Sequence, residues 1–174
     1  IGLYGGKRPT TPNIDRFFSD AILFDHAFAP ASWTLPVAAS LFTSVYPYSH
    51  GVMDRYENNR LSDDYLTITE LFKAQGYQTA AFTGGGDYNR RFNTSQGFDT
   101  FVDEDNVVDY VPGPALEEPK AGGLIRYLGI ERFVPLAVDW IARHREQRMF
   151  LLLQGYDTHC PFTPKPPFDT MFDP

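Results

Sequence analysis

Residues 67–86 read TITELFKAQGYQTAAFTGGG and contain the signals of a helix, a strand and a loop in direct succession. The apolar spacing over 67–75 predicts an amphipathic helix, and Gly76 is typical of a residue that ends one. The run from Tyr77 to Thr83 predicts a strand, and Gly84-Gly85-Gly86 predicts a flexible loop. A helix that leads directly into an apolar strand is the repeating step of an α/β fold.

The same alternation extends over most of the chain. Helices are expected from Pro12 onward, over 37–42 and over 133–144, and strands over 21–29 and 148–156. Residues 149–153 read MFLLL, the continuous apolar run of a strand buried on both faces. We therefore predict an α/β domain with a mostly parallel sheet flanked by helices.

Two stretches lack this alternation. Residues 103–123 combine acids with three prolines and three glycines, which predicts a surface excursion. Residues 160–174 contain five prolines and predict a loop. The chain starts at Ile1 without methionine and ends at Pro174 within that loop, so we expect both ends to be truncated. The sequence therefore says nothing about a targeting segment.

Composition excludes some function classes. The 174 residues are 43% hydrophobic and 21% charged, which supports a packed core, and the formal net charge is −7. An acidic balance argues against broad binding to nucleic acids or anionic membranes. An anionic substrate stays possible because a bound metal can dominate the local field. Cys160 is the single cysteine, so it has no internal disulfide partner and is expected to be inert.

Polar residues follow three of the predicted elements. Thr34 comes after the strand over 21–29, the glycine loop follows Thr83, and Asp157 with His159 follows the strand over 148–156. Ligands on parallel sheets bind beyond the carboxyl ends of the strands. Thr34 also stands where a helix begins, and the unsatisfied N–H groups there attract anions.

Several segments resemble, in order and spacing, the sulfatase family of the alkaline-phosphatase superfamily. They are YGG (4–6), TTPNID (10–15), FDHAFAP (24–30), SWTLP (32–36), HGV (50–52), GYQTA (76–80), GFD (97–99) and DTHCPF (157–162). Each motif alone is weakly specific, whereas the ordered set covers nearly the whole chain.

The resemblance implies an alkaline-phosphatase-like fold and a metal-dependent hydrolase of sulfate or phosphate esters. It implies a divalent metal, Ca²⁺ before Mn²⁺ or Zn²⁺, and a small-molecule or glycan ester as substrate. It favours an extracytoplasmic or periplasmic location. The family's remaining metal ligands would lie before Ile1 and after Pro174, so we expect residues 1–174 to be a partial catalytic domain, inactive alone, with Thr34 as its single metal ligand.

Thr34 occupies the position at which the family keeps its nucleophile. Sulfatases have Cys or Ser there, within a C/S-x-P-x-R motif, and convert it to formylglycine; here residues 34–38 read TLPVA. Threonine cannot form that aldehyde, so no formylglycine is expected, and an unmodified threonine alkoxide resembles related phosphodiesterases and phosphoryl-group transferases instead. The alternative is a threonine that only caps a helix.

Two further positions are assigned by the resemblance. His159 matches a family histidine near the leaving-group oxygen, where an imidazole can donate a proton, and Asp157 could orient it or bind substrate. Trp33, beside Thr34, is a candidate substrate-binding residue. The alternative for His159 is a polar strand end.

Other charged residues are expected to have structural roles. The lysine and histidine that follow GYxT in many arylsulfatases are missing. Arg90 and Arg91 could bind an anion, but we favour the interpretation that they are solvated charges. His50 is read as a packing residue, Asp15 as a charge that favours a helix start, and the acids at 103–105 as solvated.

A different functional class, a degenerate non-catalytic binding module, also fits the sequence. Paired aspartates upstream and an Asp-His pair downstream of these residues would favour the enzyme.

Overall fold

The computed structural model describes residues 1–56, 59–110, 128–160, 162 and 164–172, in two compact units. The sheet unit comprises Ala29–Phe162, and the terminal unit comprises Ile1–Phe28 with Thr163–Pro174. No helix in these described stretches is long and apolar enough to cross a membrane.

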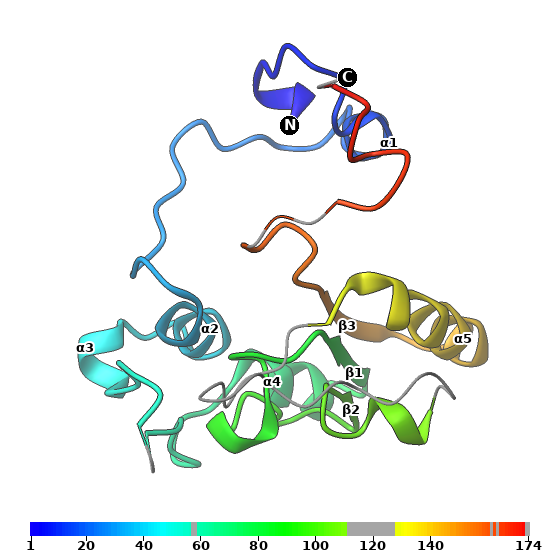
Figure 1. Cartoon of the computed structure of the whole chain (residues 1–174). Coiled ribbons are helices and arrows are strands. Elements are labelled where there is room, and N and C mark those ends of the chain that lie inside the picture. Colours follow the sequence, from blue (N-terminus) through cyan, green and yellow to red (C-terminus); the bar gives the residue numbers. More distant parts are fainter. Residues whose placement is uncertain (57–58, 111–127, 161, 163, 173–174) are drawn as a thin grey trace. The chain divides into compact units, whose positions relative to one another are not determined.

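A three-stranded parallel sheet forms the centre of the sheet unit (Figure 1). The strands are β1 (Gln78–Thr83), β2 (Thr100–Val102) and β3 (Met149–Gln154), in the order β2-β1-β3. Ala80 of β1 pairs with Thr100 on one side and with Leu151 on the other. The predicted parallel α/β architecture is confirmed.

One face of the sheet packs against α5 (Val134–His144). Side chains alternate along a strand, so Ala80 and Phe82 point to the same face, where they join Trp140 of α5 in one buried cluster. The 3-10 helices η3 (Val107–Asp109) and η4 (Ile130–Arg132) both precede this helix in the chain.

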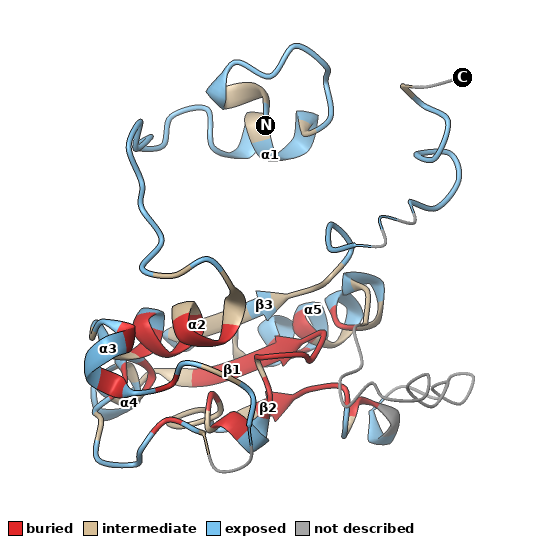
Figure 2. Ribbon diagram, turned by 60° about the vertical axis from the view of Figure 1, so that its left-hand side comes forward, coloured by how far each residue is buried: buried red, intermediate tan, exposed pale blue. Residues whose placement is uncertain are grey.

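The opposite face carries an aromatic cluster that joins the sheet to two helices. Phe98 lies 5.9 Å from Phe42 of α2 (Thr34–Thr43) and 6.0 Å from Phe150 of β3, measured between ring centroids. Phe72 of α4 (Ile68–Ala74) stacks on Phe150 at 4.5 Å. The sheet unit is therefore built in three layers, and Figure 2 shows its buried residues on β1, β2 and one side of α2.

Local signals explain where α4 begins and ends. Thr67 accepts a hydrogen bond from the backbone N–H of Glu70, while the Glu70 carboxylate accepts one from the Thr67 N–H at 2.8 Å, which forms a capping box. After the helix, Gly76 takes a φ of +76°, a conformation that glycine adopts without strain. The predicted helix, its end and the following strand are confirmed.

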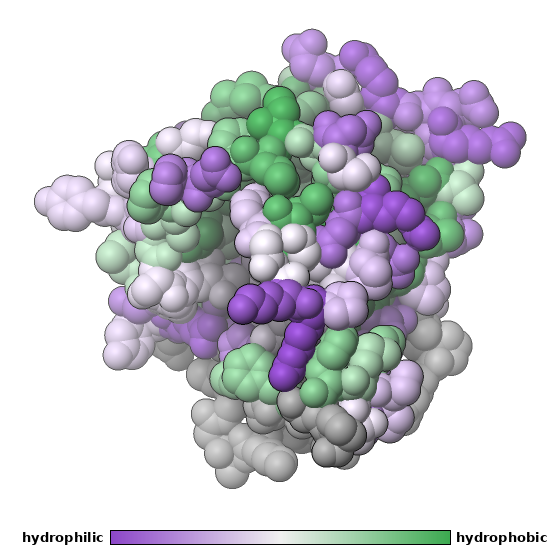
Figure 3. Space-filling view, turned by 90° about the horizontal axis from the view of Figure 1, so that it is seen from above, coloured by the Kyte–Doolittle hydropathy of each residue, from purple (hydrophilic) through white to green (hydrophobic). Residues whose placement is uncertain are grey.

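The terminal unit contains η1 (Gly2–Tyr4) and α1 (Pro12–Phe17), and no residue in 1–28 is buried. Asp15 accepts hydrogen bonds from the Leu3 N–H and the Thr11 hydroxyl, so it ties η1 to α1 in addition to lying in the first helical turn. Figure 3 shows one face of the molecule, on which hydrophobic and hydrophilic residues are interspersed.

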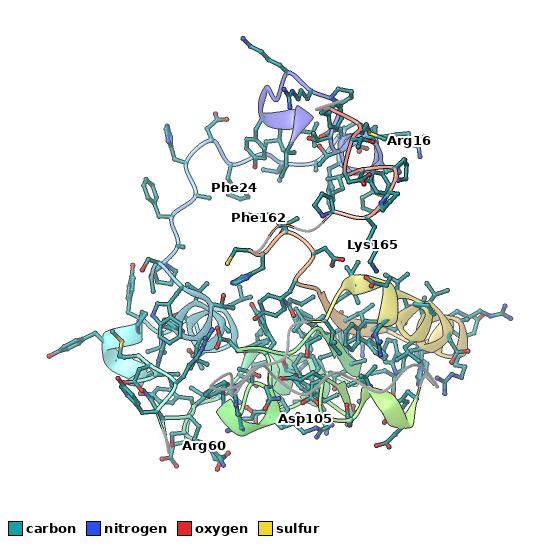
Figure 4. All side chains as sticks on the ribbon, in the orientation of Figure 1. Arg16, Phe24, Arg60, Asp105, Phe162 and Lys165 are labelled. Carbon is teal, nitrogen blue, oxygen red and sulfur yellow. The ribbon has the colours of Figure 1, made fainter. Side chains whose placement is uncertain are left out.

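Two sequence-based expectations about strands are wrong. Residues 21–29 form no strand, and Ile22, Phe24 and Phe28 are 84%, 68% and 90% exposed; Figure 4 shows Phe24 on this extended segment. A strand needs a neighbouring strand with which to form hydrogen bonds, and no strand of the described chain pairs with residues 21–29. Strand β3 is not buried on both faces, because it lies at an edge of the described sheet with Leu153 37% exposed.

The excursion expected over 103–123 lies mainly on residues outside the described ranges. At its beginning, Asp103 and Glu104 are buried, and Val107 belongs to the α5 cluster. The expectation that these adjacent acids are solvated is therefore wrong for the first two.

Candidate active site

Thr34 is the first residue of α2. The N-cap is Trp33, in extended conformation, and no side chain caps the helix. The Thr34 side chain is half-buried and makes no hydrogen bond with any other described residue. The cap alternative is thus not what the structure has: the hydroxyl stands one residue inside the helix start, beside N–H groups that lack intrahelical partners.

Helix α2 holds Thr34 in place through its buried side. Leu35 and Ala39, one turn apart, are buried in a cluster with Val52, Leu61 and Phe92, and Trp33 packs against the same cluster. Because neighbouring helix positions differ by about 100°, burying Leu35 turns Thr34 away from the centre of that cluster. Packing of α2 therefore fixes the backbone of Thr34, while the Thr34 hydroxyl is only half-buried.

His50 connects α3 (Pro47–His50) to α2. Its Nδ1 accepts the Val52 N–H at 3.1 Å, so the ring proton is on Nε2, which donates to the Ser40 hydroxyl at 3.0 Å. Burial lowers the pKa of His50 below its ordinary 6.5, and the backbone of Pro36 acts in the opposite direction. His50 is a neutral packing histidine, as expected, and with its proton on Nε2 it does not act as a base toward Ser40.

Removing the Ser40 hydroxyl should therefore destabilise the fold. In Ser40→Ala the buried Nε2–H of His50 loses its partner, and we expect the free energy of unfolding to fall by about 1–3 kcal/mol. Denaturant unfolding measures this, with exposed Ser49→Ala on α3 as the control. An unfolding free energy equal to that of the control variant would show that the bond contributes nothing.

Arg55 was not singled out by its sequence context, yet it links three segments near Thr34. Its Nε and Nη2 each donate to Asp87 at 2.6 Å, and its guanidinium lies 5.3 Å from the centre of the Trp33 ring. The Asp87 side chain is fully buried, whereas that of Arg55 is 36% exposed. Asp87 directly follows the glycine loop at the carboxyl end of β1, a position that sheet topology marks for ligands.

The glycine loop is fixed and closely packed, in contrast to the flexible loop that was expected. Gly84–Gly86 are buried, and Gly84 donates to the backbone of Gln154 and accepts from Leu128, both at 2.9 Å. A side chain on Gly85 would collide with the Glu104 carboxylate, and its φ is +87°. Glycine is needed there for close approach and backbone conformation, and the loop holds Asp87 in position.

His159 and Asp157 are exposed beyond the end of β3, and they contact different groups. His159 Nδ1 lies 2.8 Å from the Cys160 carbonyl, which places the proton on Nδ1, whereas Asp157 accepts the Ile130 N–H at 2.8 Å. The group that orients the imidazole is therefore a backbone carbonyl, where the sequence suggested Asp157. Tyr156 packs edge-on against the His159 ring at 5.4 Å.

A chain of contacts joins the two ends of the predicted site. It runs from Trp33 to Arg55, to Asp87, through the Asp87 N–H to the Tyr156 hydroxyl at 3.3 Å, and on to His159. The structure therefore brings the surroundings of Thr34 and of His159 to one end of the sheet. It adds Arg55, Asp87 and Tyr156 to the predicted residues.

A family model described as Sulfatase matches residues 1–173. The chain belongs to the sulfatase family. Arylsulfatase A of Bos taurus is 26% identical over 92% of this chain and 39% of its own length. Iduronate 2-sulfatase of Mus musculus is 35% identical over 45% of this chain and 14% of its own length. The sulfatase chain thus spans well under half of these relatives.

Solved structures confirm the fold class. A member of the alkaline phosphatase superfamily from Vibrio parahaemolyticus matches with a TM-score of 0.64 and 24% identity, over 95% of this chain and 39% of that one. Phosphonate monoester hydrolase of Agrobacterium radiobacter matches with a TM-score of 0.67 and 18% identity, over 97% of this chain and 40% of its own. At these identities the likeness shows an alkaline-phosphatase-like fold, of which this sulfatase chain holds a part.

Sulfatases and their superfamily generally use divalent metals. Within the described ranges, no three or more His, Cys, Asp or Glu side chains are grouped so as to hold an ion. These residues therefore do not fit a complete metal centre, and Thr34 has no neighbouring ligand set in this part of the sulfatase.

Arg90 and Arg91 are held against aromatic rings. Arg90 donates to the Phe101 carbonyl, lies 5.2 Å from the Phe101 ring centre and pairs loosely with Asp103 at 3.9 Å. Arg91 lies 4.5 Å from the Phe92 ring centre. Both arginines therefore have packing roles, beyond the solvated charges that the sequence suggested.

Behind the glycine loop lies a buried acidic pair. Burial raises the pKa of Glu104 to about 7 and also raises that of Asp103, with the charge of Asp105 adding to both. Glu104 Oε2 makes no hydrogen bond to any described group, and Asn89 donates to Asp105 at 2.9 Å. Asp105 is labelled in Figure 4. The sequence offered no signal for this burial.

Proposed function

We propose that the protein hydrolyses sulfate or phosphate esters and that Thr34 is its nucleophile. The observation that carries the proposal is the place of Thr34: a half-buried hydroxyl on the first residue of a ten-residue helix, without a hydrogen bond to any described group. Membership of a family of ester hydrolases supports the reaction class.

The reaction would proceed in two displacements. Thr34 Oγ gives up its proton to water and attacks sulfur or phosphorus, the bond from that atom to the alcohol oxygen breaks, and a sulfo- or phosphothreonine forms. Water then attacks the same atom, restores Thr34 and releases sulfate or phosphate. The N–H groups of Thr34 and Leu35 stabilise the negative oxygens in both steps. Since the Cys160 carbonyl holds the Nδ1–H of His159, the ring would donate a proton to the departing alcohol from Nε2, when it is doubly protonated.

The second candidate is an enzyme that acts on phosphate esters, and the threonine at position 34 is what supports it. An unmodified threonine replaces the formylglycine precursor, so a phosphodiesterase or phosphoryl-group transferase is the second candidate. The first candidate is the hydrolase of sulfate or phosphate esters. It would act on a small-molecule or glycan ester in an extracytoplasmic location, and it would use a divalent metal, Ca²⁺ in preference to Mn²⁺ or Zn²⁺. Asp157 and Trp33 would border the substrate.

The decisive assay uses the full-length protein that contains residues 1–174, and compares an aryl sulfate, a phosphate monoester and a phosphodiester, each with and without chelator. We expect turnover of at least one class and its loss with chelator. Rapid acid quenching followed by peptide mass analysis should find a sulfo or phospho group on the peptide that contains Thr34. Absence of turnover for all three classes would favour the non-catalytic binding module.

His159→Ala should slow esters with poor leaving groups more than those with good ones. A proton donor matters most when the departing alkoxide is basic, so we expect about 10²-fold loss for poor leaving groups and much less for good ones. The measurement is kcat/KM against leaving-group pKa, with His144→Ala on α5 as the control. Equal losses across the series would remove the acid role.

A further inference from the structure

Arg55 is held rigidly enough to recognise a ligand. Two hydrogen bonds of 2.6 Å join it to a fully buried carboxylate, and the Trp33 ring lies against its guanidinium at 5.3 Å. Asp87 is in turn fixed through its N–H to Tyr156. An arginine held by a fork, a ring face and a buried anchor loses little conformational freedom when it binds.

The contact with Asp87 uses one edge of the Arg55 guanidinium group and so sets the direction of its other edge. Nε and Nη2 form the side-on fork with Asp87, so the end-on edge, made of Nη1 and Nη2, is turned away from that carboxylate. A planar pair of N–H donors matches two oxygens of a tetrahedral oxyanion. The Arg55 side chain is 36% exposed, so solvent reaches it.

Trp33 connects this arginine to the proposed nucleophile. Its ring contacts the guanidinium, and Thr34 is the next residue along the chain. Consecutive Cα atoms are about 3.8 Å apart, so the Cα of Thr34 is that close to the Cα of the tryptophan whose ring Arg55 contacts. Tyr156 on the other side packs against His159.

We propose that Arg55, positioned by Asp87 and Trp33, binds the sulfate or phosphate oxygens of the ester that Thr34 attacks. This inference rests on the proposed function. It assigns an oxyanion-binding cation to a chain whose sequence lacks the lysine, histidine and arginine that its family uses there.

The ion pair with Asp87 determines the kind of contribution that Arg55 makes. Arg55 and Asp87 together carry no net charge, so long-range attraction is small and directional hydrogen bonds supply the affinity. The effect of removing the pair should therefore change little between low and high salt, unlike that of an unpaired surface arginine.

The test measures binding of inorganic sulfate and inorganic phosphate to the protein. The double variant Arg55→Gln/Asp87→Asn removes the guanidinium without leaving Asp87 charged and unpaired, and Arg55→Lys keeps the charge but loses the fork. We expect the dissociation constant to rise about tenfold or more in the double variant, and less in Arg55→Lys. Titration calorimetry measures it, and circular dichroism verifies folding.

The control is Arg143→Gln, which removes an exposed arginine paired with Asp139 on α5 and should leave anion affinity unchanged. If the folded double variant binds both anions as tightly as the unmodified protein, Arg55 is a structural link only and the inference is wrong. Thr34→Ala separates the two proposals: normal turnover in that variant would remove the nucleophile, while anion affinity in the Arg55 variants would still decide the role of Arg55.

Discussion

Thr34→Ala is expected to lower kcat/KM by at least ~10³-fold, because removing a covalent nucleophile leaves only binding and electrostatic stabilisation. The substitution removes a half-buried hydroxyl that has no hydrogen-bond partner in the described chain, so little stability depends on it. Turnover of the best ester substrate and a thermal melt, measured on the same preparations, separate loss of chemistry from loss of fold.

Thr43→Ala is the matched control at the other end of α2. The Thr43 hydroxyl donates to the Ala39 carbonyl at 2.7 Å, so its removal is expected to reduce stability slightly and to leave kcat unchanged. Thr34→Ser, which keeps a hydroxyl, should retain measurable turnover and still form the covalent intermediate. Near-normal turnover in Thr34→Ala would eliminate the nucleophile, and equal loss in Thr34→Ser and Thr34→Ala would mean that the side chain acts by shape.

Elements whose signals are local were predictable from the sequence. The capping box of Thr67 and Glu70, the glycine after α4 and the apolar pattern of β1 lie within one short stretch, and each confers its conformation independently of distant residues. The position of Thr34 at a helix start was predictable for the same reason.

Features that depend on distant partners were not predictable in this way. Residues 21–29 have the composition of a strand, but strand formation requires neighbours, and none is present in the described chain. Arg55 and Asp87 are 32 residues apart, and nothing near Arg55 marks it as a ligand of a buried carboxylate. Asp87 did carry a signal, since it follows the glycine loop at the carboxyl end of a parallel strand.

Burial of Glu104 leads to the second large effect, which concerns stability and pH. The pKa of Glu104 rises from 4.5 to about 7 on folding, so between these values the native state holds a proton that the unfolded state has released. Stability contributed by this group is full below the unfolded pKa and is lost as pH rises through the window to about 7. A shift of this size corresponds to roughly 3 kcal/mol between the two protonation states.

Glu104→Gln should therefore stabilise the protein on the alkaline side only. Glutamine is neutral at every pH and similar in shape, so the variant should gain up to roughly 3 kcal/mol over the unmodified protein at about pH 8 and be nearly equal to it at about pH 4. The measurement is the difference in unfolding free energy at each pH, which cancels opposing contributions from groups such as His50, whose lowered pKa costs stability as pH falls below 6.5.

The matched control is Glu146→Gln, which makes the same substitution at an exposed glutamate whose side chain is 86% accessible. A difference for Glu104→Gln that varies with pH no more than that of the control would mean that Glu104 is ionised in the native state and that a group outside the described chain compensates it. A gain confined to alkaline pH would instead show that the loop that positions Asp87 packs directly on a carboxyl group that burial keeps protonated below about pH 7.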